Sequence, residues 1–186
     1  MTRILGISGS LRGGSHNALL LRAAAEGLPA GAELEVWRGL REIPAYDEDL
    51  DRGPAPAAVS ALREAVAAAD AVLFATPEYN HSIPGALKNA LDWASRPLAT
   101  NPFRDKPVAV VGSSTGLFGA VWSQAELRKV LAAMGARVLD AELAVGHARD
   151  KFDADGRLLD DDVREALDAI ATALAAEVPA PVAIAA

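Results

Sequence analysis

Residues 71–89 read AVLFATPEYNHSIPGALKN, and this stretch decides the fold. It begins with a short uninterrupted apolar run, which is typical of a strand covered on both faces in a parallel sheet. A turn of polar and ring-bearing residues follows, and Ser82 and Pro84 then open a helix that ends before Pro97. Because functional groups in parallel α/β folds gather at the carboxyl ends of the strands, this turn is a candidate site.

The strand–turn–helix pattern repeats along the chain. We predict strands at residues 3–8, 33–37, 71–76, 107–112 and 137–144. We predict helices that begin after Ser15 as N-cap, at Pro56, at Ser82 and Pro84, and that span about residues 120–134 and 160–176. Strict alternation implies right-handed crossovers and a doubly wound α/β fold, with a five-stranded parallel sheet in the order 2-1-3-4-5. This order leaves a crevice above the carboxyl ends of strands 1 and 3.

Length and composition limit the possible classes of protein. The 186 residues suit one domain, residues 1–177, followed by an apolar, proline-broken tail at 178–186. A formal net charge of -7 argues against partners such as nucleic acid or an anionic membrane. With no cysteine, redox chemistry would need an organic cofactor, and we expect no metal site. Residues 1–7 enter a strand directly and the uncharged stretch 107–123 is broken by Gly and Ser, so we expect a cytoplasmic protein.

The loop after the first strand has the features of a phosphate site. Its backbone N–H groups and the start of the following helix favour an anion. The loop also has short polar side chains at Ser10, Ser15 and Asn17. Arg12 adds a charged guanidinium group that can donate two hydrogen bonds to a phosphate. The loop lacks the lysine of a nucleotide P-loop and fails the G-x-G-x-x-G pattern. Taken alone, it fits an ordinary glycine-rich turn equally well.

Three loops together carry a family resemblance. They are residues 9–17, 76–89 and 112–116, which follow the first, third and fourth predicted strands in order, and residues 43–47 match as well. In these motifs the chain resembles the NADPH-dependent FMN reductase family, the flavodoxin-like quinone, azo-dye and chromate reductases. The resemblance covers most of residues 3–176 and implies the flavodoxin-like form of the doubly wound fold.

The resemblance also implies an activity. A hydride from NADPH or NADH would pass through FMN to a quinone, flavin or other small acceptor by a ping-pong mechanism, in a homodimer or homotetramer. The implied FMN contacts are Ser10, Arg12, Ser15 and Asn17 at the phosphate, Pro77, Glu78, Tyr79 and Asn80 along the ring, and Ser113, Ser114 and Gly116 at its other end. Some members carry a tyrosine where this chain has His81, so the role of that ring in substrate stacking or subunit contact is not carried over to this chain. We interpret His81 as a solvated turn residue rather than an acid or base. Trp93, Phe118 and Trp122 are interpreted as core or subunit contacts.

Two other functions fit parts of the sequence. The acidic charge suits a flavodoxin-type electron carrier for protein partners, although no aromatic pair is evident to enclose a flavin ring. Residues 112–116 satisfy G-x-S-x-G with Ser114, and Asp140 and His147 follow in the order of an α/β-hydrolase triad. Against a serine hydrolase, the predicted helix starts several residues after Ser114, whereas a nucleophile elbow requires it immediately.

Overall fold

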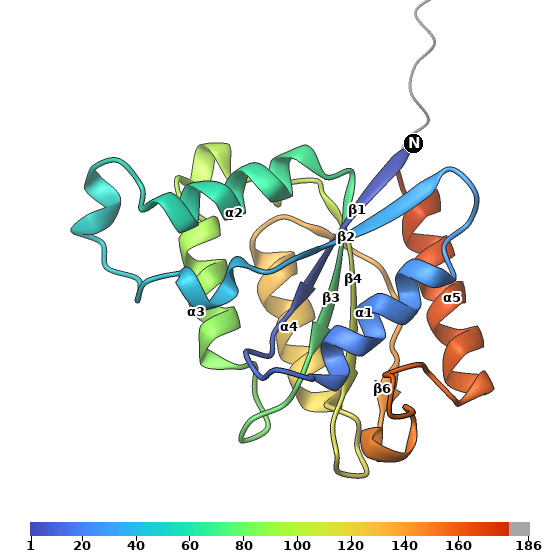
Figure 1. Ribbon diagram of the computed structural model, residues 1–186. Helices are drawn as coiled ribbons and strands as arrows, with labels where there is room; N and C mark the ends of the chain where they lie inside the picture. The colour runs from blue at the N-terminus through green and yellow to red at the C-terminus, as the bar shows by residue number, and fades with distance from the viewer. Residues whose placement is uncertain (179–186) are drawn as a thin grey trace, which may run out of the picture.

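The computed structural model describes residues 1–178 and has one parallel sheet at its centre (Figure 1). The sheet order β2-β1-β3-β4-β5 and the parallel pairing are those predicted. The predicted tail, residues 178–186, lies outside the described residues except for Val178. Within residues 1–178, no helix is long and apolar enough to cross a membrane.

The elements alternate along the chain as expected. The strands are β1 (Thr2–Ser8), β2 (Ala32–Trp37), β3 (Ala71–Thr76), β4 (Pro107–Ser113), β5 (Arg137–Val138) and β6 (Ala144–Val145). The helices are α1 (His16–Glu26), α2 (Ala57–Ala68), α3 (Gly85–Ala94), α4 (Val121–Ala133) and α5 (Asp161–Ala176). Short 3-10 helices are η1 (Gly39–Glu42), η2 (Leu50–Arg52), η3 (Leu98–Thr100) and η4 (Ala148–Asp150).

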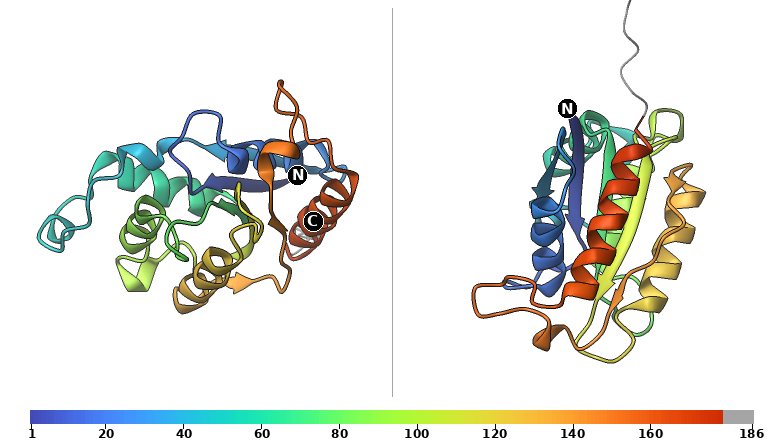
Figure 2. Two further views of the ribbon diagram at one scale, coloured as in Figure 1. Left: turned by 90° about the horizontal axis from the view of Figure 1, so that it is seen from below. Right: turned by 90° about the vertical axis from the view of Figure 1, so that its right-hand side faces the viewer.

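Helices cover both faces of the sheet because the central strands are apolar on both sides (Figure 2). Along β3, Val72 and Phe74 pack in the cluster formed with α2, α3 and α4, whereas Leu73 and Ala75 pack in the cluster formed with α1 and α5. This alternation follows from the two-residue period of a strand. The resulting three layers place the carboxyl ends of β1, β3 and β4 at one edge of the molecule.

The prediction of a single fifth strand over residues 137–144 is wrong. The segment forms two short strands, β5 and β6, which both pair with β4. Between them, the N–H of Ala141 donates to the carbonyl of Leu139 (2.9 Å), a three-residue turn that bends the chain out of the ladder. The guanidinium of Arg128 holds this bend by donating to the carbonyl of Ala141 and to the carboxylate of Asp140.

Ser15 is the N-cap residue of α1, as predicted, but its side chain does not make the expected capping hydrogen bond. Its backbone is extended and its hydroxyl is buried. By contrast, the carboxylate of Asp160 caps α5 by accepting from the N–H of Val163 (3.0 Å). Because the first N–H groups of a helix have no partner inside it, those of α1 stay available to a ligand.

Candidate functional site

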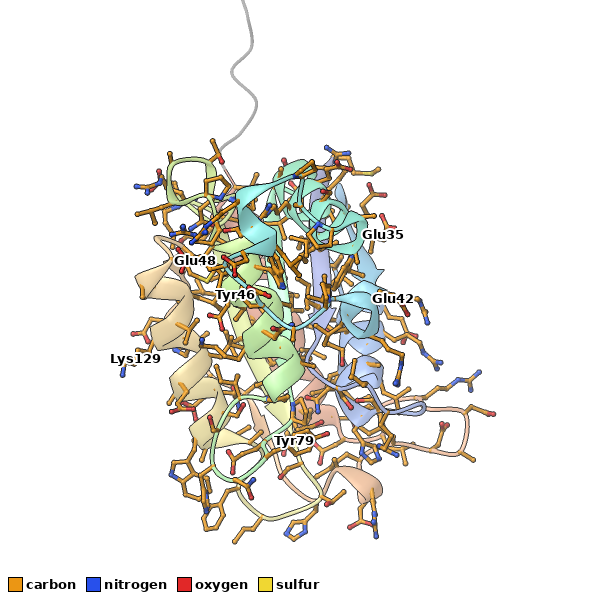
Figure 3. All side chains as sticks on the ribbon, turned by 90° about the vertical axis from the view of Figure 1, so that its left-hand side faces the viewer. Glu35, Glu42, Tyr46, Glu48, Tyr79 and Lys129 are labelled. Atoms are coloured by element: carbon orange, nitrogen blue, oxygen red, sulfur yellow. The ribbon has the colours of Figure 1, made fainter. Side chains whose placement is uncertain are left out.

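A pocket lies where β1, β3 and β4 end. It is lined by Ser10, Arg12, Ser15, His16, Asn17, Pro77, Glu78, Tyr79, Ser113, Ser114 and Thr115. The structure therefore brings together every predicted contact residue except Asn80 and Gly116, which belong to the same loops. Figure 3 labels Tyr79 at this edge of the molecule. The sequence patterns did not predict that His16 and Thr115 line the pocket. The one signal for them was that they lie within two of the loops that match the family.

The loop after β1 forms one wall of the pocket. The N–H of Arg12 donates to the hydroxyl of Ser10 (3.3 Å), which folds the loop back toward the start of α1. Gly14 has a φ of +67°, and a side chain at Gly13 or Gly14 would meet nothing within 4 Å. The loop therefore offers open space beside the unpartnered N–H groups of α1, and such a helix start favours an anion.

Asn17 joins this wall to the end of β4. Its side-chain amide donates to the carbonyl of Ser113 (3.0 Å), and its side-chain oxygen accepts from the N–H of Ser113 (2.9 Å). β3 ends at Thr76, which pairs with Gly112, so Ser113 has no ladder partner from β3. Asn17, only 3% exposed, takes the place of that strand and positions the β4 loop relative to α1.

The loop after β3 forms the opposite wall. Tyr79 and Ser82 exchange two backbone hydrogen bonds, and Asn80 and His81 between them have φ of 54° and 59°. These angles identify a type I′ turn, which is rigid and tight. The carboxylate of Glu78 accepts from the N–H groups of Trp122 (3.0 Å) and Ser123 (3.1 Å). It therefore stabilises the positive start of α4 and fixes the turn to that helix.

The comparisons with known proteins agree with this geometry. Residues 2–150 match the sequence model of a family described as NADPH-dependent FMN reductase. The chain belongs to the NADPH-dependent FMN reductase family. It is 48% identical over 164 residues to an NAD(P)H-dependent FMN reductase of Pseudomonas aeruginosa, a match covering 88% of each chain. It is 39% identical over 153 residues to a quinone reductase of Escherichia coli, a match covering 81% of each chain.

Among solved structures, the chain is similar to FerB, a flavoenzyme NAD(P)H:(acceptor) oxidoreductase from Paracoccus denitrificans. The two share a TM-score of 0.86 and 32% sequence identity, over 96% of this chain and 97% of that chain. The predicted family, the flavodoxin-like fold and the prediction of a flavin-dependent oxidoreductase are thus confirmed.

The loop after β4 does not form the nucleophile elbow of a hydrolase. The Oγ of Ser114 donates to the carbonyl of Gly116 (3.3 Å), and α4 begins only at Val121. Asp140, the acid of the alternative triad, forms an ion pair with Arg128 (2.8 Å). Within residues 1–178, no side-chain hydrogen bond links Ser114 with His147 or His147 with Asp140. The loop is instead held by backbone bonds, such as that from the N–H of Ser114 to the carbonyl of Val145 (3.0 Å).

An exposed aromatic cluster joins the turn after β3 to the start of α4. The ring of Trp122 contacts those of His81 (centroids 4.5 Å apart) and Phe118 (5.0 Å) edge-on. Phe118 is 59% and Trp122 40% exposed, so both are available for subunit contacts. The His81 side chain is 73% exposed, as expected of a solvated turn residue. Trp93, in contrast, is fully buried in the core.

Arginine charges act on His16 at the α1 end of the pocket. The Nη2 of Arg12 lies 3.4 Å from the Nδ1 of His16. Burial lowers the pKa of His16, and the guanidinium groups of Arg12 and Arg149 lower it further. A side chain held near two cations resists protonation, so this end of the pocket disfavours the charged form of His16.

Proposed function

We propose that the chain is an FMN-dependent NAD(P)H oxidoreductase that reduces a quinone, a flavin or another small acceptor. The single observation that carries this proposal is the pocket that joins an anion-binding loop to a rigid turn across one sheet edge. FMN has a phosphate at one end and a flat ring at the other, and the pocket offers a surface for each. The names of the similar proteins, an NAD(P)H-dependent FMN reductase and a quinone reductase, support the same chemistry.

The phosphate of FMN would lie at the loop after β1. Arg12 supplies a charged fork, the start of α1 supplies N–H groups, and Ser10 and Ser15 supply hydroxyls. The pocket as a whole fits FMN, because the buried Oγ of Ser113, in the loop after β4, has no hydrogen-bond partner within the described residues. A buried hydroxyl without a partner is costly, so it indicates a ligand that completes it. In this arrangement Asn17 acts mainly by holding Ser113.

The ring would lie between the two remaining loops. Residues 77–80 form one edge, chiefly through backbone groups of the rigid turn, and Ser113, Ser114 and Gly116 form the other end. When bound, FMN would accept a hydride from NAD(P)H and pass the electrons to the acceptor. The residues of this chain would seat the ring and leave one side open. Nicotinamide and acceptor would then use the same open side in turn, by a ping-pong mechanism.

The proposal extends to the oligomeric state and the cellular location of the enzyme. The exposed side chains of Leu117, Phe118 and Trp122, of which Phe118 and Trp122 are in contact, support a homodimer or homotetramer, because clustered apolar surface favours subunit contacts. The composition supports a cytoplasmic enzyme that acts on small molecules rather than on nucleic acid or a membrane surface.

Steady-state kinetics test the proposed function. The protein supplied with FMN should oxidise NAD(P)H in the presence of a benzoquinone, with no partner protein added. A flavodoxin-type carrier would bind FMN but would need a partner reductase before it turned over NAD(P)H. Rates no higher than those of free FMN alone would reject the enzyme.

A further inference from the structure

We propose that His16 and Arg12 form a proton-coupled phosphate site, in which His16 takes up one proton from solvent when the phosphate of FMN binds and Arg149 contributes charge from outside the pocket lining. The inference rests on the proposed function and adds to it two residues, His16 and Arg149, and a dependence of cofactor binding on pH. Arg12 in the loop after β1 and His16 in the first turn of α1 both line the pocket, and Arg149 in η4 acts on His16 through its charge.

The position of His16 suits this role. It is the first residue of α1, it lines the pocket, and its ring stacks on Phe152 with centroids 5.8 Å apart. The guanidinium of Arg12 can only donate, so at 3.4 Å the Nδ1 of His16 is placed to accept. An accepting Nδ1 requires a neutral ring whose proton is on Nε2.

The surrounding charge disfavours protonation of His16 until an anion binds. Its pKa is lowered by burial and by Arg12 and Arg149. Within residues 1–178, neither arginine forms an ion pair, although the chain as a whole has a formal net charge of -7. The other titratable groups lining the pocket are Glu78 and Tyr79, and the Glu78 carboxylate is bound by the N–H groups of α4. The α1 end is therefore an uncompensated positive site.

A bound phosphate reverses the effect of these charges. A dianion close to His16 favours the protonated ring, and a protonated His16 donates a charge-assisted hydrogen bond to it. Binding then takes up a proton, so affinity rises as the pH falls. Because one unit of pKa corresponds to about tenfold in affinity, the contribution of His16 is large enough to measure.

The experiment compares FMN with riboflavin, which has the same ring but no phosphate. Both are titrated into the wild type and into His16→Gln at pH 8, 7 and 6. We expect the FMN affinity of the wild type to gain about tenfold more than that of His16→Gln over this range. The phosphate of FMN itself ionises with a second pKa of about 6, but this contribution is common to both proteins and cancels. Riboflavin affinity should depend on pH equally in both.

Two further measurements test proton uptake without relying on the affinity of His16→Gln alone. Calorimetry of FMN binding at pH 7 in buffers of different ionisation enthalpy should show proton uptake for the wild type and for His147→Asn, but not for His16→Gln. The chain has 3 histidines, so NMR can follow each ring, and the pKa of His16 should rise on addition of FMN.

Each outcome decides the inference. A pH dependence of FMN affinity that is the same in the wild type and His16→Gln would overturn it while leaving the proposed function standing. An NMR pKa of His16 that does not rise with FMN would also overturn it, without any variant that has to fold. A wild type that binds no FMN would overturn both the inference and the proposed function.

Discussion

Replacing Asn17 with alanine should destabilise the protein even without FMN. The substitution leaves the N–H and the carbonyl of Ser113 without the partners that now lie at 2.9 and 3.0 Å. Each buried backbone group left unpaired costs about 1 to 3 kcal/mol. Water entering from the pocket offsets part of this cost, so we expect a loss of about 2 to 4 kcal/mol in the free energy of unfolding. A residue that only touched the phosphate would change FMN affinity and leave this stability unaltered.

The assay is urea unfolding of the FMN-free protein, with the slope of the transition checked for constancy. Ser114→Ala is the matched control, because it removes one long hydrogen bond near the surface and should stay within about 0.5 kcal/mol of the wild type. If Asn17→Ala unfolds at the wild-type urea concentration, then the bridge between α1 and β4 is not structural, and the reasoning about Asn17 is refuted.

Three other predictions concern the proposed site. Arg12→Ala should weaken FMN binding about 10- to 100-fold through loss of a charge-assisted bond, with FMN-free stability hardly changed; titration showing unaltered affinity would remove Arg12 from the site. Ser114→Ala should keep most NAD(P)H oxidation and a serine-directed phosphonate should not label Ser114, whereas stoichiometric labelling, or esterase turnover abolished by His147→Ala, would support a hydrolase. Double-reciprocal plots with NAD(P)H varied at several quinone concentrations should give parallel lines, because donor and acceptor use one open side in turn; intersecting lines would indicate separate sites.

Most of the fold was predictable because its signals are local. Each central strand is an apolar run bounded by turn residues. The order of the strands in the sheet follows from the alternation of strands and helices and from the right-handed crossovers between parallel strands. The bend between β5 and β6 was not predictable from residues 137–144, because it depends on Arg128, which reaches the segment from α4. Local patterns do not reveal a side chain that arrives from another element.

The same limit applies to the site. The walls of the pocket were predicted, since loops at the carboxyl ends of parallel strands meet at one edge. The hydrogen bond between Asn17 and Ser113 joins residues 96 positions apart in the sequence. The sequence therefore indicated Asn17 only as a contact of the cofactor, whereas the structure shows that it also links α1 to β4. His16 reads as an ordinary first-turn residue until Arg149 and Phe152 are placed beside it by the fold.

One titration tests the central claim that this pocket binds FMN by its phosphate. FMN and riboflavin are added separately to the purified protein, and the change in flavin fluorescence is followed to saturation. The account predicts one FMN per chain and a riboflavin affinity at least about tenfold weaker, since riboflavin lacks the charge-assisted bonds at the loop after β1. Equal affinity for the two flavins, or no saturable binding of FMN, would contradict it.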